Sequence, residues 1–564
     1  MMIGSDILVA TLEEMGVEYI FGVPGEETLD LLESLRKSSI ALILTRHEQT
    51  AAFMAATWGR LTGKPGVCLA TCGPGALNMT TAAAYAHLGA MPMIMITGQK
   101  SIFSSPQAGF QVTDVVGTFR PITKFSCTIS AVCDISSLTR NAFQLATNER
   151  RGPVLLELPE DVASAECETP PLLSRTNTGT MVASPADLER VSALILSAKR
   201  PLVMLGAAAN RPEAYEGIHT FIQKLELPFF TTQMGMGADG GLDDYFLGTA
   251  ALSRNDYLHD LIASADLIIS IGHDTVEKPP FIPQPANQRI LHIGYIKPCV
   301  ATVYNPDEEL IGDISFNLHA LTRLLHGRME QTSTLLHARN VIHDRTGGNS
   351  EKETWPPAPR QIVRAVRNIM PDDGIVALDN GMYKLWFARN YRAMAPNTLL
   401  LDNMLATMGA GLPSAMTAAL LYPNRRVLAV CGDGGFMMNS QDLETAVRLM
   451  LNLVVLIIDD GAYGMIRWKQ EAEGYADFGM TFSNPDFVQY ARAYGASGYR
   501  VQASDDIANI IDSAFNAGGV HLVIVPIDYS ENMTVLVEEL SIRETHSFSE
   551  NFEHKKNDFP ESHP

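Results

Sequence analysis

The chain has 564 residues, and its 42 Lys and Arg against 63 Asp and Glu give a formal net charge of −21. Because an acidic surface repels phosphate backbones, this charge argues against nucleic acid as a partner. With 46% hydrophobic and 19% charged residues, the composition is typical of a globular protein of about three or four domains and excludes a disordered chain. The N-terminus lacks the basic and apolar regions of a signal peptide, and no apolar run approaches the roughly 20 residues of a membrane span, so we expect a cytoplasmic protein without a membrane partner.

Short apolar runs alternate with helical patterns along nearly the whole chain. This rhythm is typical of βαβ units, in which helices cover both faces of a parallel sheet. A first domain is predicted over residues 1–167, with strands at 19–21, 40–44, 67–71, 93–97 and 154–156. The stretch 168–185 is rich in Pro, Ser and Thr and lacks periodicity, so it is interpreted as a linker.

A second domain is predicted over residues 186–325, with strands at 201–205, 228–231, 267–271 and 289–293. The polar segment 330–359 marks the next boundary. A third domain follows over 360–540, with strands at 374–377, 398–401, 426–431, 453–458 and 521–526, and residues 541–564 form a polar C-terminal tail. The predicted fold class is therefore α/β, with three consecutive doubly wound parallel-sheet domains, of which the first and third share a similar size and rhythm.

The sharpest local signal is a glycine-rich stretch after the strand at 426–431. Gly432, Gly434 and Gly435 allow a ligand to approach the backbone, and a helix predicted from about Ser440 directs its N-terminus at the same place, as a phosphate site requires. Asp433 stands among these glycines. Because a carboxylate beside a phosphate needs a cation between them, the stretch predicts a hard divalent ion such as Mg²⁺.

A second carboxylate, Asp460, lies 27 residues after Asp433 and directly follows the strand at 453–458. One strand-helix-strand unit separates the two, so both are expected at the carboxyl edge of one parallel sheet, where such folds bind ligands. The glycine-rich stretch around Asp433 and the strand exit at Asp460 are each common turns when found alone. Together at this spacing, they are much more specific for a ligand site. The other phosphate motifs, GxxxxGK[ST] and GxGxxG with its distant acidic residue, are not present.

Residues 432–460 resemble the diphosphate- and metal-binding motif of the thiamine diphosphate enzymes. The likeness extends over about residues 1–540 and implies pyrimidine-binding, central and diphosphate-binding domains in that order. It implies that the side chains of Asp433 and Asp460 and the carbonyl of Ala462 ligate Mg²⁺. Many members have Asn in place of Asp460, a departure that catabolic acetolactate synthases share. The resemblance further implies cofactor contacts in the third domain from Gly381, Met382, Tyr383, Met408, Gly432, Gly434, Gly435, Tyr463 and Met465.

Glu48 follows the strand at 40–44 and begins a predicted helix. Taken alone, it is a first-turn Glu stabilised by the helix dipole. The resemblance implies instead that Glu48 hydrogen-bonds the aminopyrimidine of the cofactor and activates it. It also implies that the turns with Pro24, Gly25, Gly73 and Asn78 pass close to that ring.

The segment 109–124 resembles the acetohydroxyacid synthase group of this family. The likeness implies that Phe110 lines the substrate pocket, Gln111 approaches the thiazolium and Lys124 lies near the substrate channel. Residues 271–281 differ from the flavin-associated stretch of the anabolic enzymes, so FAD is not expected. Lys469 stands where those enzymes have a Trp that favours 2-oxobutyrate, and Trp468 precedes it, which makes pyruvate the expected donor and acceptor.

The resemblance therefore implies a cytoplasmic acetolactate synthase-like carboligase. It would decarboxylate pyruvate and join the product to a second pyruvate, giving 2-acetolactate and CO₂ with thiamine diphosphate and Mg²⁺. Since the first domain must meet a metal site in the third, a homodimer or homotetramer with sites between subunits is implied. The alternatives are a thiamine diphosphate enzyme acting on another 2-oxo acid or an acyl-CoA, a flavin-dependent pyruvate oxidase, and a non-catalytic nucleotide- or metal-binding module.

Overall fold

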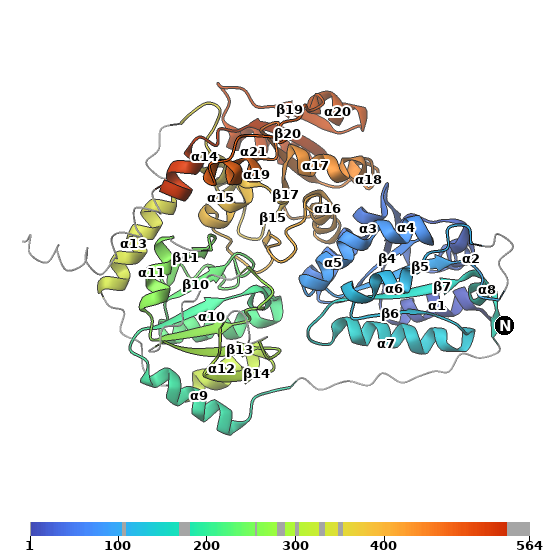
Figure 1. Ribbon diagram of the computed structural model, residues 1–564, viewed down its shortest axis with the longest axis horizontal. Helices are drawn as coiled ribbons and strands as arrows, with labels where there is room; N and C mark the ends of the chain where they lie inside the picture. The colour runs from blue at the N-terminus through green and yellow to red at the C-terminus, as the bar shows by residue number, and fades with distance from the viewer. Residues whose placement is uncertain are drawn as a thin grey trace, which may run out of the picture.

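The computed structural model describes residues 2–103, 109–167, 181–253, 256–278, 288–298, 304–325, 333–347 and 353–538. Each of three domains is built on a six-stranded parallel sheet with helices on both faces (Figure 1), which confirms the predicted fold class. The predicted tail, 541–564, and most of the predicted linker, 168–180, lie outside the described residues.

The first domain, blue to cyan in Figure 1, has the strand order β3-β2-β4-β5-β7-β6. Its strands are β2 (Tyr19–Gly22), β3 (Ala41–Leu44), β4 (Gly66–Ala70), β5 (Met93–Gln99), β6 (Phe125–Thr128) and β7 (Pro153–Pro159). Its helices are α1 (Gly4–Glu14), α2 (Leu29–Arg36), α3 (Glu48–Thr62), α4 (Gly73–Asn78), α5 (Thr80–Leu88), α6 (Val115–Phe119), α7 (Ile135–Thr147) and α8 (Glu160–Ser164). A short antiparallel pair, β1 (Met2–Ile3) with β8 (Glu166–Cys167), closes the domain.

The third domain, yellow to red in Figure 1, repeats this topology with the strand order β16-β15-β17-β18-β20-β19. Its strands are β15 (Ile375–Leu378), β16 (Leu399–Leu400), β17 (Val427–Gly432), β18 (Leu453–Asp459), β19 (Ser497–Arg500) and β20 (Val520–Pro526). Its helices are α14 (Pro359–Ile369), α15 (Met382–Asn390), α16 (Gly411–Leu421), α17 (Asp433–Asn439), α18 (Leu443–Arg448), α19 (Gly464–Ala472), α20 (Phe487–Ala493), α21 (Ile507–Ala517) and α22 (Glu531–Met533). The two sheets therefore share a strand order as well as a size.

The central domain, green in Figure 1, has a different strand order, β11-β10-β9-β12-β13-β14, which is typical of dinucleotide-binding sheets. Its strands are β9 (Pro201–Leu205), β10 (Phe229–Thr232), β11 (Phe246–Ala250), β12 (Leu267–Ile271), β13 (Arg289–Gly294) and β14 (Glu308–Ile311). Its helices are α9 (Pro185–Ser197), α10 (Tyr215–Leu225), α11 (Tyr257–Ser264), α12 (Ile314–Leu324) and α13 (Ser333–Gly347).

Besides the short β1 and β8 pair, the structure adds four strands to the six-stranded sheets that the sequence did not predict: β6, β11, β14 and β19. All four lie at sheet edges, where one side of the strand is less covered and the apolar run is diluted by polar residues. The predicted boundary segment 330–359 also differs, because it contains helix α13. Ala338 and Ile342, four residues apart, are buried and give this polar helix an apolar stripe, and the helix packs on β11.

Helices α3 and α16 join the first and third domains. The buried hydroxyls of Thr57 and Ser414 lie 3.0 Å apart across this contact, and Thr417 donates to the carbonyl of Met54 at 3.3 Å. Apolar residues of both sheets merge around the two helices into one buried cluster. The contact fixes the two related domains against each other within one chain.

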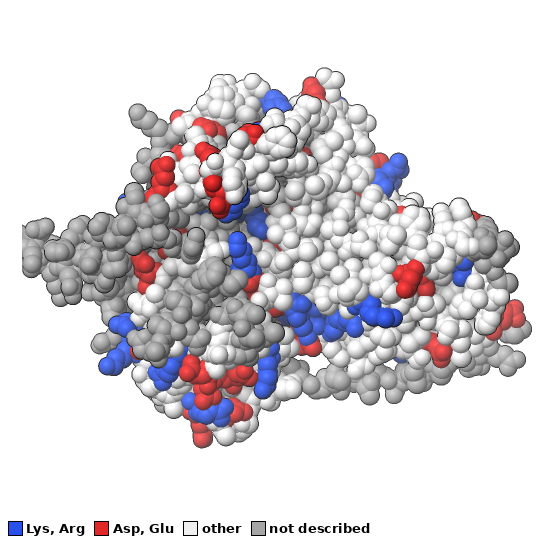
Figure 2. All heavy atoms as spheres, in the orientation of Figure 1, with Lys and Arg blue, Asp and Glu red and all other residues white. Residues whose placement is uncertain are grey.

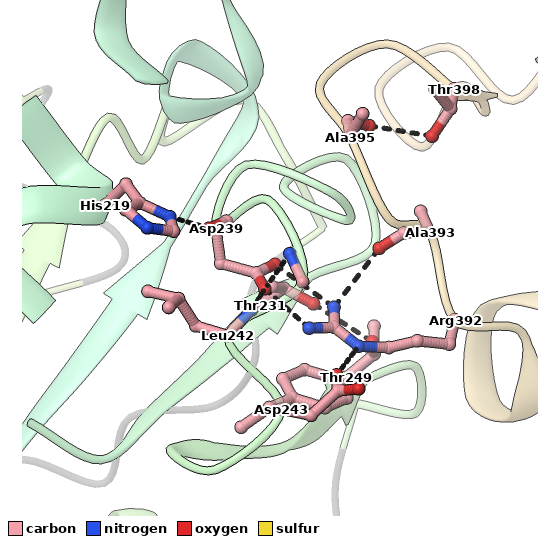
Figure 3. Close-up of polar contacts among 12 residues, drawn as sticks. His219, Thr231, Asp239, Leu242, Asp243, Thr249, Arg392, Ala393, Ala395 and Thr398 are labelled. Atoms are coloured by element: carbon pink, nitrogen blue, oxygen red, sulfur yellow. Dashed lines mark hydrogen bonds and ion pairs between the residues drawn. The ribbon is translucent and has the colours of Figure 1, made fainter. Parts of the chain in front are cut away.

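Ion pairs that are largely buried, apart from the exposed Asp243, join the central and third domains. Figure 3 shows Arg392 reaching between two carboxylates of the central domain; its guanidinium contacts Asp239 at 2.5 Å and Asp243 at 2.8 Å. A second pair, Arg389 with Asp256 at 3.0 Å, is almost completely buried. Since a buried charge is costly without its partner, these pairs specify one placement of the two domains.

Candidate active site

The carboxyl ends of β15, β17 and β18 and the loop after β16 line a cavity of about 1050 Å³, and its remaining walls come from helix α19, the segment after β20 and the central domain. The lining includes every third-domain residue that the sequence singled out: Gly381, Met382, Tyr383, Met408, Gly432, Asp433, Gly434, Gly435, Asp460, Ala462, Tyr463, Met465, Trp468 and Lys469. Residues nearly 90 positions apart thus meet in one place.

Helix α17 begins at Asp433, well before the helix start predicted near Ser440, where the structure has a turn of 3₁₀ helix that leads into α18. Gly434 and Gly435 form its first turn instead of a loop. Close neighbours explain the glycines: a Cβ on Gly435 would lie 2.6 Å from the carboxylate of Asp379, and one on Gly434 would lie 2.9 Å from the ring of Tyr463. The glycines therefore allow close packing around a helix N-terminus that faces the cavity.

The Asp433 carboxylate is held by neighbouring donors. It accepts hydrogen bonds from the backbone N–H groups of Gly434 and Gly461 and from the amide of Asn484, each at 2.7 Å. Burial raises the pKa of Asp433. Burial, followed by the charge of Asp433, raises the pKa of Asp460 to about 7. Two carboxylates in such an arrangement favour a cation between them.

The donors in this cavity fit a magnesium ion that is shared with phosphate. Within the described ranges, no group of three or more His, Cys, Asp or Glu side chains converges to hold a metal by itself. Mg²⁺ in phosphate sites is held by one or two carboxylates together with phosphate oxygens, which matches the Asp433 and Asp460 pair beside a helix N-terminus. The remaining lining is largely apolar, with Met382, Met408 and Trp468, and suits the rings of a cofactor.

The first-domain residues gather at the carboxyl edge of their own sheet. Glu48 begins α3 after β3 and accepts a hydrogen bond from Asn78 at 2.9 Å, and it is 9% exposed. His47 caps the same helix, since its ring accepts from the backbone of Gln49 at 3.0 Å. A Cβ on Gly75 would lie 3.2 Å from the Glu48 carboxylate. Pro24 and Gly25 follow β2 on this edge.

Sequence analysis missed a buried ion pair on this edge. Lys100, directly after β5, contacts Glu27 at 2.5 Å, and Thr71 donates to the other oxygen of Glu27. Burial opposes ionisation of Glu27, but the contacts of Lys100 and Thr71 lower its pKa to about 2. A charged residue directly after a buried strand is the signal that would have indicated Lys100.

The segment after β5 brings one of its three predicted residues, Gln111, against the turn that carries Gly73. The carbonyl of Gln111 lies 2.4 Å from where a Cβ on Gly73 would stand, and Phe110 beside it is 59% exposed. Lys124 lies at the amino end of β6, where its amine donates to the carbonyl of Asn148 at 2.5 Å. The structure therefore does not bring Lys124 together with Glu48.

The two groups of residues stay apart within one chain. No first-domain residue lines the cavity of the third domain among the described residues, so Glu48 and Asp433 belong to separate surfaces. We call them the pyrimidine half, around Glu48, Gly73 and Asn78, and the metal half, around Asp433 and Asp460.

The dinucleotide position of the central domain is filled by its own side chains. Glu277, which is 1% exposed, accepts from the backbone N–H of Ala207 at 2.7 Å and from the hydroxyl of Thr232 at 2.5 Å. A Cβ on Gly206 would lie 2.3 Å from the backbone of His273. The Glu277 carboxylate and the close packing of Gly206 on the backbone of His273 therefore close the crevice at the carboxyl ends of β9 and β12.

Replacing Glu277 by Gln is expected to change how stability depends on pH. Burial raises the pKa of Glu277 from its usual 4.5 to about 7, so between these values the folded chain holds a proton that the unfolded chain has lost. The contribution of Glu277 to the free energy of unfolding therefore decreases as the pH rises through this range, by about 3 kcal/mol in total. The melting temperature of the variant, relative to that of the parent, should be higher at pH 8 than at pH 5. An equal offset at both pH values, as expected for the exposed Glu216→Gln, would contradict this.

The sequence matches all three domains of the thiamine pyrophosphate enzymes. Residues 2–118 match the N-terminal TPP binding domain, residues 188–324 the central domain and residues 379–525 the C-terminal TPP binding domain. An acetolactate synthase from Bacillus subtilis is 32% identical over 543 residues and 95% of each chain. The chain belongs to the thiamine pyrophosphate-dependent acetolactate synthase family.

Other relatives in the acetolactate synthase family are similarly close. A catabolic acetolactate synthase from Raoultella terrigena is 32% identical over 94% of this chain and 96% of its own length. The large subunit of acetolactate synthase isozyme 2 from Escherichia coli is 30% identical over 95% of this chain and 97% of its own. Membership makes this chain a thiamine pyrophosphate-dependent carboligating enzyme, which removes the non-catalytic binding module from the alternatives.

In the described part of this acetolactate synthase family member, no helix is both long and apolar enough to cross a bilayer. A cytoplasmic location stays a prediction.

Proposed function

We propose that this enzyme decarboxylates pyruvate and transfers the resulting two-carbon unit to a second pyruvate, releasing 2-acetolactate and CO₂, with thiamine diphosphate and Mg²⁺. The observation that carries the proposal is the metal half, in which the buried Asp433, the half-buried Asp460 and a helix N-terminus face one largely apolar cavity. Relatives named acetolactate synthase, one of them catabolic, support pyruvate as the substrate.

Each group of residues has a distinct task in this proposal. Asp433, Asp460 and the carbonyl of Ala462 hold Mg²⁺, and the N-terminus of α17 binds the diphosphate. Met408 packs against the cofactor rings, and Glu48 holds a proton at the aminopyrimidine. When bound, thiamine diphosphate supplies an electron sink for the carbon that loses CO₂. The apolar lining excludes water, which favours transfer to a second 2-oxo acid over release.

We infer that the enzyme works without FAD. The Glu277 carboxylate accepts a hydrogen bond from the backbone N–H of Ala207. In a sheet of this strand order, a bound dinucleotide phosphate would need a backbone donor of this kind. A phosphate at this place would meet a buried carboxyl group that already occupies the donor. This favours the carboligase over a flavin-dependent pyruvate oxidase.

We also propose that the active site forms between two copies of the chain. The pyrimidine half and the metal half lie apart within one chain, and exposed apolar residues flank both: Leu77, Phe110 and Val112 near the first, and Met437, Met438, Tyr463 and Ile466 near the second. Figure 2 shows few charged side chains on the face where the first and third domains meet. Such a face favours burial against a second copy, giving a homodimer or a homotetramer built from it.

Mixing two inactive variants tests this assembly. After the variants Glu48→Gln and Asp433→Ala are unfolded and refolded together, half of the dimers are mixed, and one of their two sites combines an intact pyrimidine half with an intact metal half. We expect recovery of about a quarter of the parental activity. Refolding Glu48→Gln with a Glu48→Gln, Asp433→Ala double variant is the control and should recover none. No recovery in the first mixture would place the site within one chain.

Product analysis tests the reaction itself. The purified protein is incubated in air with pyruvate, thiamine diphosphate, Mg²⁺ and inorganic phosphate, with and without FAD, and acetolactate, CO₂ and acetyl phosphate are measured. We expect acetolactate at equal rates in both mixtures. Acetyl phosphate formed only with FAD would instead support the oxidase, whereas acetolactate that requires FAD would contradict the inference of an enzyme that works without FAD. Untouched pyruvate with bound cofactor would direct attention to other 2-oxo acids and acyl-CoA substrates.

A further inference from the structure

Lys384 is a buried cation with an unusual set of contacts. It lies in the first turns of α15, lines the cavity and is 6% exposed. Its amine donates to the side-chain oxygen of Asn380 at 2.7 Å and to the backbone carbonyl of Asp402 at 2.6 Å. Both acceptors are neutral, and burial lowers the pKa of Lys384 to about 8 although the charges of Asp402 and Asp379 oppose this shift. A cation held in this way is costly, which indicates that its contacts have a task.

These contacts reach both ends of the loop that carries Met408. Asp402 begins the loop, and its carboxylate accepts from the backbone of Ala406 at 2.6 Å. Near the other end, the amide of Asn380 donates to the carbonyl of Thr407 at 2.6 Å. Lys384 therefore bridges residue 402 directly and residue 407 through Asn380.

The loop is strained at one point and anchored beyond it. Ala406 has φ +55°, a conformation that residues with a Cβ rarely adopt without support. After Met408, the backbone N–H of Gly409 donates to Asp379 at 2.9 Å, and its carbonyl accepts from Asn439 at 2.7 Å. Met408 thus lies between Thr407, which the Lys384 bridge reaches through Asn380, and the anchored Gly409.

We propose that Lys384 is a positioning residue that holds loop 402–409, and through it the Met408 side chain, in the geometry that bound thiamine diphosphate requires. The role of Met408 belongs to the proposed function, on which this inference rests. Without the Lys384 amine, the carbonyl of Asp402 and the amide of Asn380 lose their shared partner, and the strained turn at Ala406 relaxes. Met408 then moves while the metal half stays in place.

The test compares Lys384→Met with the parent by three measurements. Trp468 lies in the cavity and is 7% exposed, so its fluorescence reports thiamine diphosphate binding in the presence of Mg²⁺. Near-ultraviolet circular dichroism reports the conformation of the bound cofactor, and initial rates give kcat and KM. We expect cofactor affinity to change less than about tenfold, the dichroism of the bound cofactor to change, and kcat to fall about 10- to 100-fold with KM for pyruvate nearly constant.

Three further variants keep the interpretation specific. Asn380→Asp retains an acceptor for the Lys384 amine but places an oxygen against the Thr407 carbonyl, so it should reproduce the altered dichroism without removing the cation. Lys384→Arg should restore part of the parental signal. Lys224→Met, which removes an amine that donates to the carbonyl of Thr322 in the central domain, is the matched control and should resemble the parent.

Specific outcomes overturn the proposal. An unchanged dichroism spectrum in a folded Lys384→Met variant with bound cofactor would show that the loop does not depend on Lys384. If Lys278→Met, which removes another lysine from the cavity wall, gives the same changes, the charge of the cavity accounts for them instead. A rise in KM alone would assign the amine to the substrate carboxylate. The binding and dichroism measurements need no turnover, so they remain decisive if pyruvate is not the substrate.

Discussion

Replacing Glu48 by Gln is expected to lower kcat by about 10²- to 10⁴-fold, the range that a positioned proton-transfer group contributes. Gln keeps the size of the side chain and an oxygen that accepts from Asn78, so helix α3 and its neighbours should remain in place. It cannot share or hold a carboxyl proton at the aminopyrimidine. Initial rates with pyruvate, together with a titration of thiamine diphosphate, separate these effects, since cofactor affinity should change only a few-fold.

The control for Glu48→Gln is the same change at an exposed site of the first domain. Glu33 on α2 pairs with Arg36 at the surface, and Glu33→Gln should leave both kcat and cofactor affinity within about twofold of the parent, as surface ion pairs contribute little. A Glu48→Gln variant with normal turnover would remove Glu48 from the proposed mechanism. Loss of cofactor binding would make Glu48 a binding residue instead.

Asp433→Ala is expected to weaken Mg²⁺-dependent binding of thiamine diphosphate by about 100-fold or more. Even residues that only orient metal ligands typically contribute 10- to 100-fold in metal affinity, and Asp433 is proposed to be a ligand itself. The variant should also lose the difference between titrations with Mg²⁺ and with a chelator, which calorimetry measures directly. An unchanged affinity that still depends on Mg²⁺ would contradict the metal role.

A neighbouring carboxylate provides the matched control for Asp433. Asp459, at the end of β18, accepts from Asn484 at 2.9 Å and pairs with Arg500 at 2.7 Å. These partners already occupy its oxygens, so Asp459→Asn should change cofactor affinity less than about threefold. Comparable losses in the two variants would indicate general damage to this edge of the sheet.

The metal half could be predicted from the sequence because its signals are local. Asp433 and Asp460 each follow a buried apolar strand, and parallel strands bring their carboxyl ends to one edge, so spacing alone placed them together. The helix start at Asp433 was missed because glycines are poor helix formers, and only contacts with distant residues such as Asp379 explain them.

The parts that were missed depend on contacts between distant segments. The Glu27 and Lys100 pair and the Lys384 bridge join residues whose partners are set by the sheet order, not by neighbouring sequence. The edge strands β6, β11, β14 and β19 were missed because a strand with one open side needs no continuous apolar run. The separation of Glu48 from Asp433 within one chain follows from domain packing, which no motif encodes; only the resemblance to the family implied a site between subunits.

The buried charges at the joint of the central and third domains have a consequence for motion during turnover. Arg389 and Arg392 are held by Asp256 and Asp239, and separating either pair would leave an uncompensated charge in a poorly hydrated place. A hinge at this joint is therefore energetically unfavourable, and the cavity wall from the central domain behaves as a rigid rim. Substrate entry and product exit must then rely on fluctuations elsewhere along the opening, so the rate of release is set by segments outside this joint.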